Sequence, residues 1–449
     1  MRSLLGPILF VMLCLADLNA QAWWFTADTA TEAETSFQFY VTWEAPEAPD
    51  EALAKELIEE QLLHLFGSLT EHEFPGVPKG NHRISDVRVE STGLNQYRIH
   101  YQYQGTLLVT EGPIDTYQVA LPYNPRKIYQ QSAVESVDEK GNKKTTYPCT
   151  DDYYDTEDDF WYFWYPNWEG CPLVSGTHYE WVSAKIERIP NSKETYPDYP
   201  RLAMNGEIKV SVLFGKDEAE SPRNPMRSKD ESAENFRTIR KNLLDLGFIE
   251  EKWNRRKVKD VVPVKMGGKA HVPFVAEYFR EGARADMRVL LFYGETGIDE
   301  KSGAFHYFLK DALENSSVMI YNGHSGLGGN LDIEDIEDSQ GFTIQPNPSR
   351  YQIYFYDSCS SYPYYNSMYF GRKQTEWDPR GTYNLDILTN GLWTYFSTEK
   401  NTSWVLVDAV SEWARGGFVV SYQQMAKAIE SNSLFGVNGD EDNPVEPPK

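Results

Sequence analysis

Residues 318–326 read VMIYNGHSG, an apolar run that leads into a glycine-containing loop with His324. Residues 351–361, YQIYFYDSCSS, repeat this arrangement, and there the loop holds Cys359. Short apolar runs of this kind are typical of strands that are buried on both faces of a parallel sheet. In such a sheet the carboxyl ends of the strands meet at one edge. If the two strands are neighbours, we expect His324 and Cys359 to share that edge.

The sequence around these two runs alternates between apolar strands and amphipathic helices. We predict further strands at 208–214, 287–293 and 404–407, and helices at 232–246, 304–313 and 422–429. Buried strands that alternate with helices indicate a sheet covered on both faces. Residues 201–436 are therefore predicted to form an α/β domain with a mostly parallel sheet flanked by helices.

Residues 23–200 have a different pattern. Apolar residues recur at helical spacing over 51–69, and residues 83–129 contain a series of alternating apolar and polar stretches that is typical of strands. This segment is predicted to be an N-terminal α+β domain. Residues 437–449 are acidic and rich in proline, so we expect a loose C-terminal tail.

The first 22 residues have the three parts of a secretory signal peptide. These parts are the basic Arg2, the apolar stretch 4–16 and the small-residue site at 20–22. Cleavage is expected before Trp23, and it also removes Cys14. No later stretch has the roughly 20 continuous apolar residues that a membrane-spanning helix needs. The sequence predicts a secreted or periplasmic protein without an integral membrane segment after removal of the signal.

The chain is strongly acidic. It has 67 Asp and Glu residues against 43 Lys and Arg residues, which gives a formal charge of -24. The field of such a protein repels phosphate backbones and anionic lipid surfaces. We therefore expect no nucleic acid partner, and the sequence carries no indication of an oligomeric state.

Three cysteines follow the predicted cleavage site. Cys149 and Cys171 enclose a short aromatic and acidic segment and are predicted to form a disulfide, which persists in an exported protein. Cys359 then remains as a thiol. A thiol that remains in an exported protein suggests a reactive role, and the alternative is a buried, inert cysteine.

Residues 151–168 contain six acidic and nine aromatic residues. The density of aspartate suggests calcium, but the segment lacks the fixed spacing of Asp, Asn and Gly in a known calcium loop. We expect a surface loop closed by the disulfide, with ion binding as the alternative. Apart from His324, the histidines show no metal-ligand spacing, so no metal site and no cofactor are predicted.

His324 and Cys359 together fit thiol catalysis. A thiolate attacks a carbonyl carbon, and a nearby imidazole carries the proton that later goes to the leaving amine. The glycines around His324 let the backbone approach a substrate, and the N–H groups of Gly323, Ser325 and Gly326 are predicted to bind an oxyanion. A histidine after a strand is often only a packing residue. Two such motifs occur, each directly after a predicted strand, and the histidine precedes the cysteine. Their joint occurrence favours catalysis.

These two motifs resemble those of the caspase-like cysteine peptidases of clan CD, and they are closest to those of metacaspases, gingipains and clostripain. Members of this family carry a catalytic His, usually as His-Gly, after one apolar strand, and the nucleophilic Cys, often as Asp-Ser-Cys, after the next. Residues 322–326, NGHSG, and residues 357–359, DSC, are similar to these motifs. The resemblance covers residues 205–436. It implies a caspase-like fold with His324 as general acid/base and Cys359 as nucleophile.

The resemblance also implies a substrate preference. In metacaspase-like relatives the acidic residue two positions before the Cys helps to line the pocket for a basic P1 side chain. Asp357 occupies that position, and a buried carboxylate complements Arg or Lys. The alternative is that Asp357 only caps the following turn. Two positions depart from the family, because Ser325 stands where Gly usually follows the His, and residues 360–362, SSY, replace His-Ser-Gly.

These features predict an exported cysteine endopeptidase that uses a Cys/His dyad and cleaves peptide or protein substrates after Arg or Lys. The alternative is a catalytically inactive caspase-fold module that binds proteins or glycans at the cell surface. Two observations favour that alternative. Tyr and Trp are abundant and suit recognition surfaces, and two positions depart from the family motifs.

Overall fold

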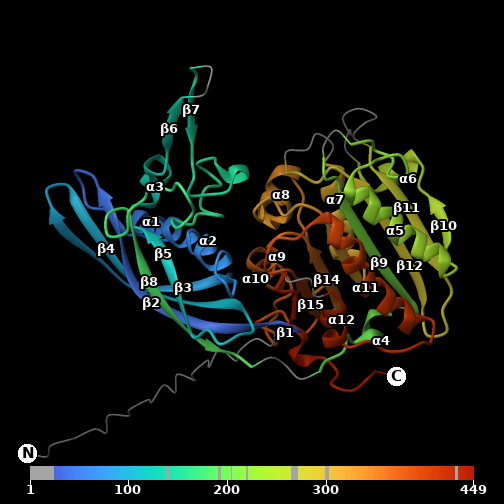
Figure 1. The fold of residues 1–449 in the computed structure, drawn as a ribbon. Helices are drawn as coiled ribbons and strands as arrows, with labels where there is room; N and C mark the ends of the chain where they lie inside the picture. Colours follow the sequence, from blue (N-terminus) through green and yellow to red (C-terminus); the bar gives the residue numbers. More distant parts are fainter. Residues whose placement is uncertain are drawn as a thin grey trace, which may run out of the picture.

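The computed structural model describes residues 25–137, 141–190, 194–203, 205–218, 221–263, 272–298, 303–429 and 433–448. The predicted signal peptide and Cys14 lie outside these residues. Two large sheets dominate the structure, one of nine strands and one of five, and they lie on opposite sides of the molecule (Figure 1). The described chain is a mixed α/β protein, as predicted.

The nine-stranded sheet has a parallel centre and antiparallel edges. Its central strands are β9 (Glu207–Gly215), β12 (Asp286–Gly294), β13 (Val318–Asn322), β14 (Gln352–Asp357) and β15 (Leu385–Thr389). One edge holds β10 (Ile249–Lys252) and β11 (Phe274–Arg280), and the other holds β16 (Gly436–Asn438) and β1 (Phe25–Ala27). The prediction of a mostly parallel sheet therefore holds only for the centre. The edge strands are short or partly polar, so they lack the apolar run on which that prediction relied.

Helices cover both faces of this sheet, because its buried strands alternate their side chains between two apolar cores (Figure 1). Val318 and Ile320 of β13 face the first core, whereas Met319 and Tyr321 face the second. The first core is covered by α5 (Glu231–Asp245), α11 (Phe396–Ala414) and α12 (Tyr422–Ile429). The second is covered by α6 (Arg255–Val261), α7 (Ala304–Asn315), α8 (Ile333–Gln340) and α10 (Ser367–Gly371). No helix in the described ranges is long and apolar enough to cross a membrane.

The strand predicted at 404–407 is wrong, since these residues lie inside α11. Their sequence, WVLV, has the β-branched composition of a strand. In the structure the buried residues recur at helical spacing and pack in the first core, namely Leu406, Val407, Val410 and Trp413. The helical spacing of the apolar residues over the whole segment decides the structure here, whereas the composition of residues 404–407 alone does not.

Residues 30–188 contain the second sheet, whose strands are all antiparallel, as an α+β region predicts. The strand order β3-β4-β2-β8-β5 comprises β2 (Ala30–Glu44), β3 (Gly76–Gly93), β4 (Gln96–Thr110), β5 (Thr116–Pro122) and β8 (Tyr179–Arg188). The helix predicted at 51–69 divides at His64 into α1 (Glu51–Leu63) and α2 (Leu65–Thr70), which pack on this sheet. Shorter elements follow: α3 (Pro125–Gln131), the hairpin of β6 (Val134–Val137) and β7 (Lys143–Thr146), and α4 (Tyr199–Leu202).

The beginning and the end of the described chain meet in the large sheet. β1 precedes the five-stranded sheet in the sequence, yet it pairs with β16. β16 and the 3-10 helix Asp440–Asp442 belong to the segment that was predicted to be a loose tail. That prediction is wrong for residues 437–440, because Val437 and Asp440 are buried, whereas Val445 further along is 58% exposed. Thr26 and Thr195 donate hydrogen bonds to the Asp440 carboxylate, which is why this acidic residue can lie away from water.

Hydrogen bonds to a buried ion pair of the five-stranded sheet also join the two sheets. The Lys79 ammonium of β3 lies 2.6 Å from the Glu32 carboxylate of β2, and both side chains are almost fully buried. The same carboxylate accepts hydrogen bonds from the Tyr362 hydroxyl of α9 (Ser361–Tyr364) at 2.7 Å and from the Asn438 amide at 3.2 Å. Because Tyr362 follows Cys359 closely in the chain, this network fixes the N-terminal sheet against the turn that holds the thiol.

We expect replacement of Lys79 by methionine to destabilise the protein, because Glu32 would keep a buried charge without its cation. Breaking a buried ion pair from one side lowers the free energy of unfolding by about 3–5 kcal/mol. The double variant Lys79→Met, Glu32→Gln should recover most of that loss, since the glutamine oxygen still accepts from Tyr362 and Asn438. Urea unfolding at pH 7 measures both effects. Equal stability of the single and double variants would contradict this role of the buried charge.

Candidate active site

The register of β13 and β14 places His324 and Cys359 at the same edge of the large sheet. Asn322 of β13 pairs with Asp357 of β14, and each candidate catalytic residue comes two positions later in the chain. The Gly323 N–H donates to the Asp357 carbonyl at 3.4 Å, which continues the pairing into the loops. The structure therefore brings together the two loops that the sequence motifs selected.

Cys359 lies in the turn between β14 and α9 and is partly exposed. Among the described residues, it is the only cysteine that does not belong to a disulfide. Its thiol donates to the Thr394 carbonyl at 3.3 Å, and the Thr394 N–H donates to the sulfur at 3.4 Å. A donor that faces the sulfur favours the thiolate, which is the nucleophilic form. The next residue, Ser360, has a φ of 46°, a strained conformation that is common near functional sites.

The His324 imidazole lies beside a carboxylate and an aromatic ring. Its Nε2 is 3.4 Å from Oδ1 of Asp217 and 3.3 Å from the Asp217 carbonyl oxygen. The ring also meets Phe396 edge to face, with centroids 5.0 Å apart. The side chain is 52% exposed, and its Nδ1 makes no hydrogen bond within the described residues. Nδ1 is therefore the nitrogen that can meet a reacting group.

Asp217 is a candidate functional residue that the sequence prediction missed. It follows β9, the strand beside β13, so it lies at the same carboxyl edge. Asp230, which caps α5, fixes its position, because one carboxylate oxygen accepts the N–H groups of Asp217 and of the next residue. A polar residue directly after an apolar strand was the signal that selected His324 and Cys359. The same signal could have found Asp217.

The loop after β13 offers backbone donors at the predicted oxyanion site. Gly323 requires glycine, because a Cβ there would lie 2.7 Å from the Tyr321 hydroxyl. Gly326 has a φ of 58°, the left-handed region that favours glycine. In the described part of the chain the N–H groups of Ser325 and Gly326 donate to no protein acceptor, whereas that of Gly323 donates to the neighbouring strand. Ser325 and Gly326 are therefore the available donors among the three predicted ones.

Asp357 is buried beneath the two loops. It is 1% exposed, and its carboxylate accepts hydrogen bonds from Asn322, Asn390, Thr402 and Ser403. Burial raises the pKa of Asp357 to about 6, although hydrogen bonds from Ser403, Thr402 and Asn322 favour the charged form. None of these hydrogen bonds caps the following turn. Thr402 and Ser403 of α11 donate to one oxygen of this carboxylate, so a basic substrate side chain that pairs with that oxygen would displace these hydrogen bonds.

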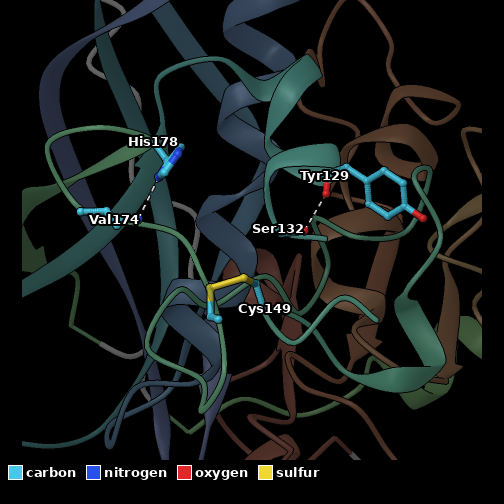
Figure 2. Close-up of a disulfide and its surroundings, with 6 residues drawn as sticks. Tyr129, Ser132, Cys149, Val174 and His178 are labelled. Carbon is cyan, nitrogen blue, oxygen red and sulfur yellow. Dashed lines mark hydrogen bonds between the residues drawn. A yellow bond between two sulfur atoms is a disulfide. The ribbon is translucent and has the colours of Figure 1, made fainter. Parts of the chain in front are cut away.

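The predicted disulfide between Cys149 and Cys171 is present (Figure 2). It closes the aromatic and acidic loop at 151–168, and just beyond it the Val174 N–H donates to His178 at 2.9 Å (Figure 2). Across the described ranges no three His, Cys, Asp or Glu side chains form a group that could hold a metal ion.

Aromatic residues of the disulfide-closed loop lie against the turn that holds the thiol. The hydroxyls of Tyr162 and Ser360 are 2.7 Å apart and buried. The ring of Phe163 packs on Trp393, with centroids 5.3 Å apart. Burial raises the pKa of Tyr154 to about 12, and negative charge on nearby Cys359 adds to this shift. The loop thus forms a wall beside Cys359, a role that the sequence prediction did not assign to it.

We expect the stability of the protein to depend on pH through Asp357. Its carboxyl loses the proton at about pH 4 in the unfolded chain, whereas burial raises the pKa of Asp357 to about 6 in the folded protein. Between these values the folded state binds more protons than the unfolded state. The free energy of unfolding therefore falls as the pH rises, by about 3 kcal/mol in total.

The variant Asp357→Asn lacks this titration. The unfolding free energy of the wild type minus that of the variant should decrease by about 2 kcal/mol between pH 4 and pH 7. Urea unfolding at several pH values measures this difference. Parallel curves for the two proteins would mean that the carboxyl titrates alike in the folded and unfolded chains.

The sequence was also compared with known proteins. No model of a known protein family matches the chain, and no curated protein matches it either.

Proposed function

We propose that the protein is a cysteine endopeptidase with a caspase-like fold, in which Cys359 and His324 are the catalytic residues. One observation carries the proposal. Asn322 pairs with Asp357, so the imidazole and the thiol come from neighbouring loops at one edge of the sheet. The parallel centre of the sheet and the helices on both of its faces support the fold part of the proposal.

The proposed reaction passes through an acyl-enzyme. The Cys359 thiolate attacks the scissile carbonyl carbon, so a C–S bond forms and the C–N bond then breaks. The protonated His324 gives its proton to the leaving amine. His324 then takes a proton from a water molecule, whose oxygen attacks the thioester, so the C–S bond breaks and the carboxylic acid leaves. The Cys359 thiolate and the protonated His324 are thereby restored. The N–H groups of Ser325 and Gly326 stabilise the negative oxygen of the tetrahedral intermediates.

Asp217 acts as a positioning residue in this mechanism. Its carboxylate and carbonyl oxygens both lie near Nε2 of His324, so they hold the Nε2–H and leave Nδ1 for the thiol and the substrate. The carboxylate also attracts the positively charged imidazolium that forms together with the thiolate. Asp217 does not itself touch the reacting atoms.

The proposed cleavage after Arg or Lys draws on the family resemblance and on local charge. A basic side chain that pairs with Oδ2 of Asp357 would displace its hydrogen bonds from α11. Further negative charge lies near the thiol, because Asp151 and Asp159 both act on Tyr154, the neighbour of Cys359. A cationic side chain at the cleavage position is the electrostatic complement of these groups.

A binding module without catalysis is the second candidate function. Tyr153 and Tyr395 favour it, since they are 83% and 65% exposed and adjoin Tyr154 and Thr394 of the site. Exposed tyrosines are common in recognition surfaces.

We expect the protein to hydrolyse fluorogenic peptides that end in Arg or Lys, faster than matched peptides that end in Leu or Asp. Cys359→Ala should lower the rate by at least about 1,000-fold, because it removes the nucleophile. Initial rates on the four peptides with both proteins measure this. Equal rates for the two proteins would show that Cys359 is not the nucleophile.

Alkylation separates the enzyme from the binding module. A thiol beside an imidazole should react with iodoacetamide well below about pH 8.5, where ordinary thiols ionise, and His324→Ala should remove this advantage. The binding module would be favoured if Cys359 reacted with the pH dependence of an ordinary thiol and if His324→Ala left this dependence unchanged.

Replacement of Asp217 by alanine should lower kcat by about 10- to 100-fold with little change in KM, because a misplaced imidazole affects the chemistry more than binding. The alkylation profile of Cys359 should also move to higher pH, since the imidazolium loses an attractive charge. Glu218→Gln is the matched control, as it neutralises the next carboxylate, which is exposed. An unchanged pH profile in Asp217→Ala would contradict the positioning role.

A further inference from the structure

A groove of ≈ 990 Å³ lies between the N-terminal sheet and the large sheet. One wall consists of residues from α1, α2 and β3. The other wall consists of the loop after β13, the start of α8, and residues from α9 and α10. Its volume lies in the range of small-molecule and peptide sites, about 300–1,000 Å³.

The groove adjoins the candidate active site. Residues 327–329 line it and belong to the loop that holds His324, and Tyr364 lines it from α9, which follows the thiol turn. Trp161 lines it from the disulfide-closed loop, whose next residue contacts that same turn. The groove therefore borders both loops of the candidate site.

The chemistry of the groove combines an apolar lining with acidic groups. Several apolar side chains line it, including Leu62, Leu63, Phe66, Trp161 and Met368. Leu63 is 45% exposed, so part of this apolar surface is in contact with water. Burial of such surface against a partner is favourable.

The negative charge of the groove is not balanced by its cations. Glu59, Glu334 and Asp335 line it, and the last two have no cationic partner within the described residues. Lys79 and Arg372 also line it, but each lies in an ion pair with a carboxylate from outside the groove, at 2.6 and 3.0 Å. The groove therefore attracts positive charge.

We propose that this groove binds an extended polypeptide segment that alternates apolar and basic residues. The acidic side chains of α8 pair with the basic residues, and the apolar lining buries the others. That this segment belongs to the substrate rests on the proposed peptidase function, whereas binding itself does not. The groove then selects protein substrates by residues beyond the cleavage position.

The probe is a fluorescein-labelled peptide that alternates leucine, lysine and glycine, and fluorescence anisotropy measures its binding to the full chain carrying Cys359→Ala. Charge reversal by Glu334→Lys with Asp335→Lys should weaken binding about tenfold or more. Gly329→Trp tests, independently of charge, whether the peptide occupies the groove. A side chain fits at this position, since a Cβ at Gly329 meets no atom within 4 Å. The substitution should also weaken binding about tenfold, because the indole fills the groove.

The matched control is Glu47→Lys with Glu51→Lys, which reverses two exposed acidic residues near the start of α1. Affinity for the probe should stay within about twofold in this control. Equal loss in the control, or equal binding of a peptide with glutamate in place of lysine, overturns the groove inference. Retained groove binding in a protein that hydrolyses no peptide would instead overturn the proposed function and leave the groove inference standing.

Discussion

The parallel pairing of β13 with β14 is the constraint on which the candidate site depends. Both strands are buried on two faces, so their side chains alternate between the two apolar cores. A slip of one residue would move every side chain to the wrong core, which makes the register costly to change. The position of His324 beside the Cys359 turn is thus a product of core packing. The loops themselves contribute only the chemistry.

Beneath these loops, Asp357 connects the elements that carry them. Its partners come from the end of β13, from the segment after β15 and from α11. A buried carboxylate with several donors fixes the relative position of those segments, at the cost of removing a charge from water. The family resemblance links Asp357 to substrate recognition. In this structure Asp357 also connects the segments that lie beneath the site.

The sequence was sufficient to predict the central strands β9, β12, β13 and β14, the two motif loops and the disulfide, because each depends on a local pattern, whereas the fifth central strand, β15, was not predicted. β1 and β16 were missed, since strands this short carry no measurable periodicity. α11 contains a strand-like run, and only its length and its packing partners make it helical. Asp217 could have been predicted, because it follows an apolar strand as His324 and Cys359 do. The role of Tyr154 and Tyr162 could not have been predicted, because it depends on how two distant segments of the chain pack together.

The pairing of β1 with β16 has a consequence for the order of folding. Thr26 and Asp440, which hydrogen-bond beside this pair of strands, are 414 positions apart in the sequence. Contacts between such distant residues close a very large loop of chain. Closing this loop lowers the conformational entropy of the chain, so we expect these contacts to form late in folding. The outer edge of the large sheet can form only after residue 438 has been synthesised. An incomplete chain would therefore present an open sheet edge, a template for pairing with other chains, until β16 has been synthesised.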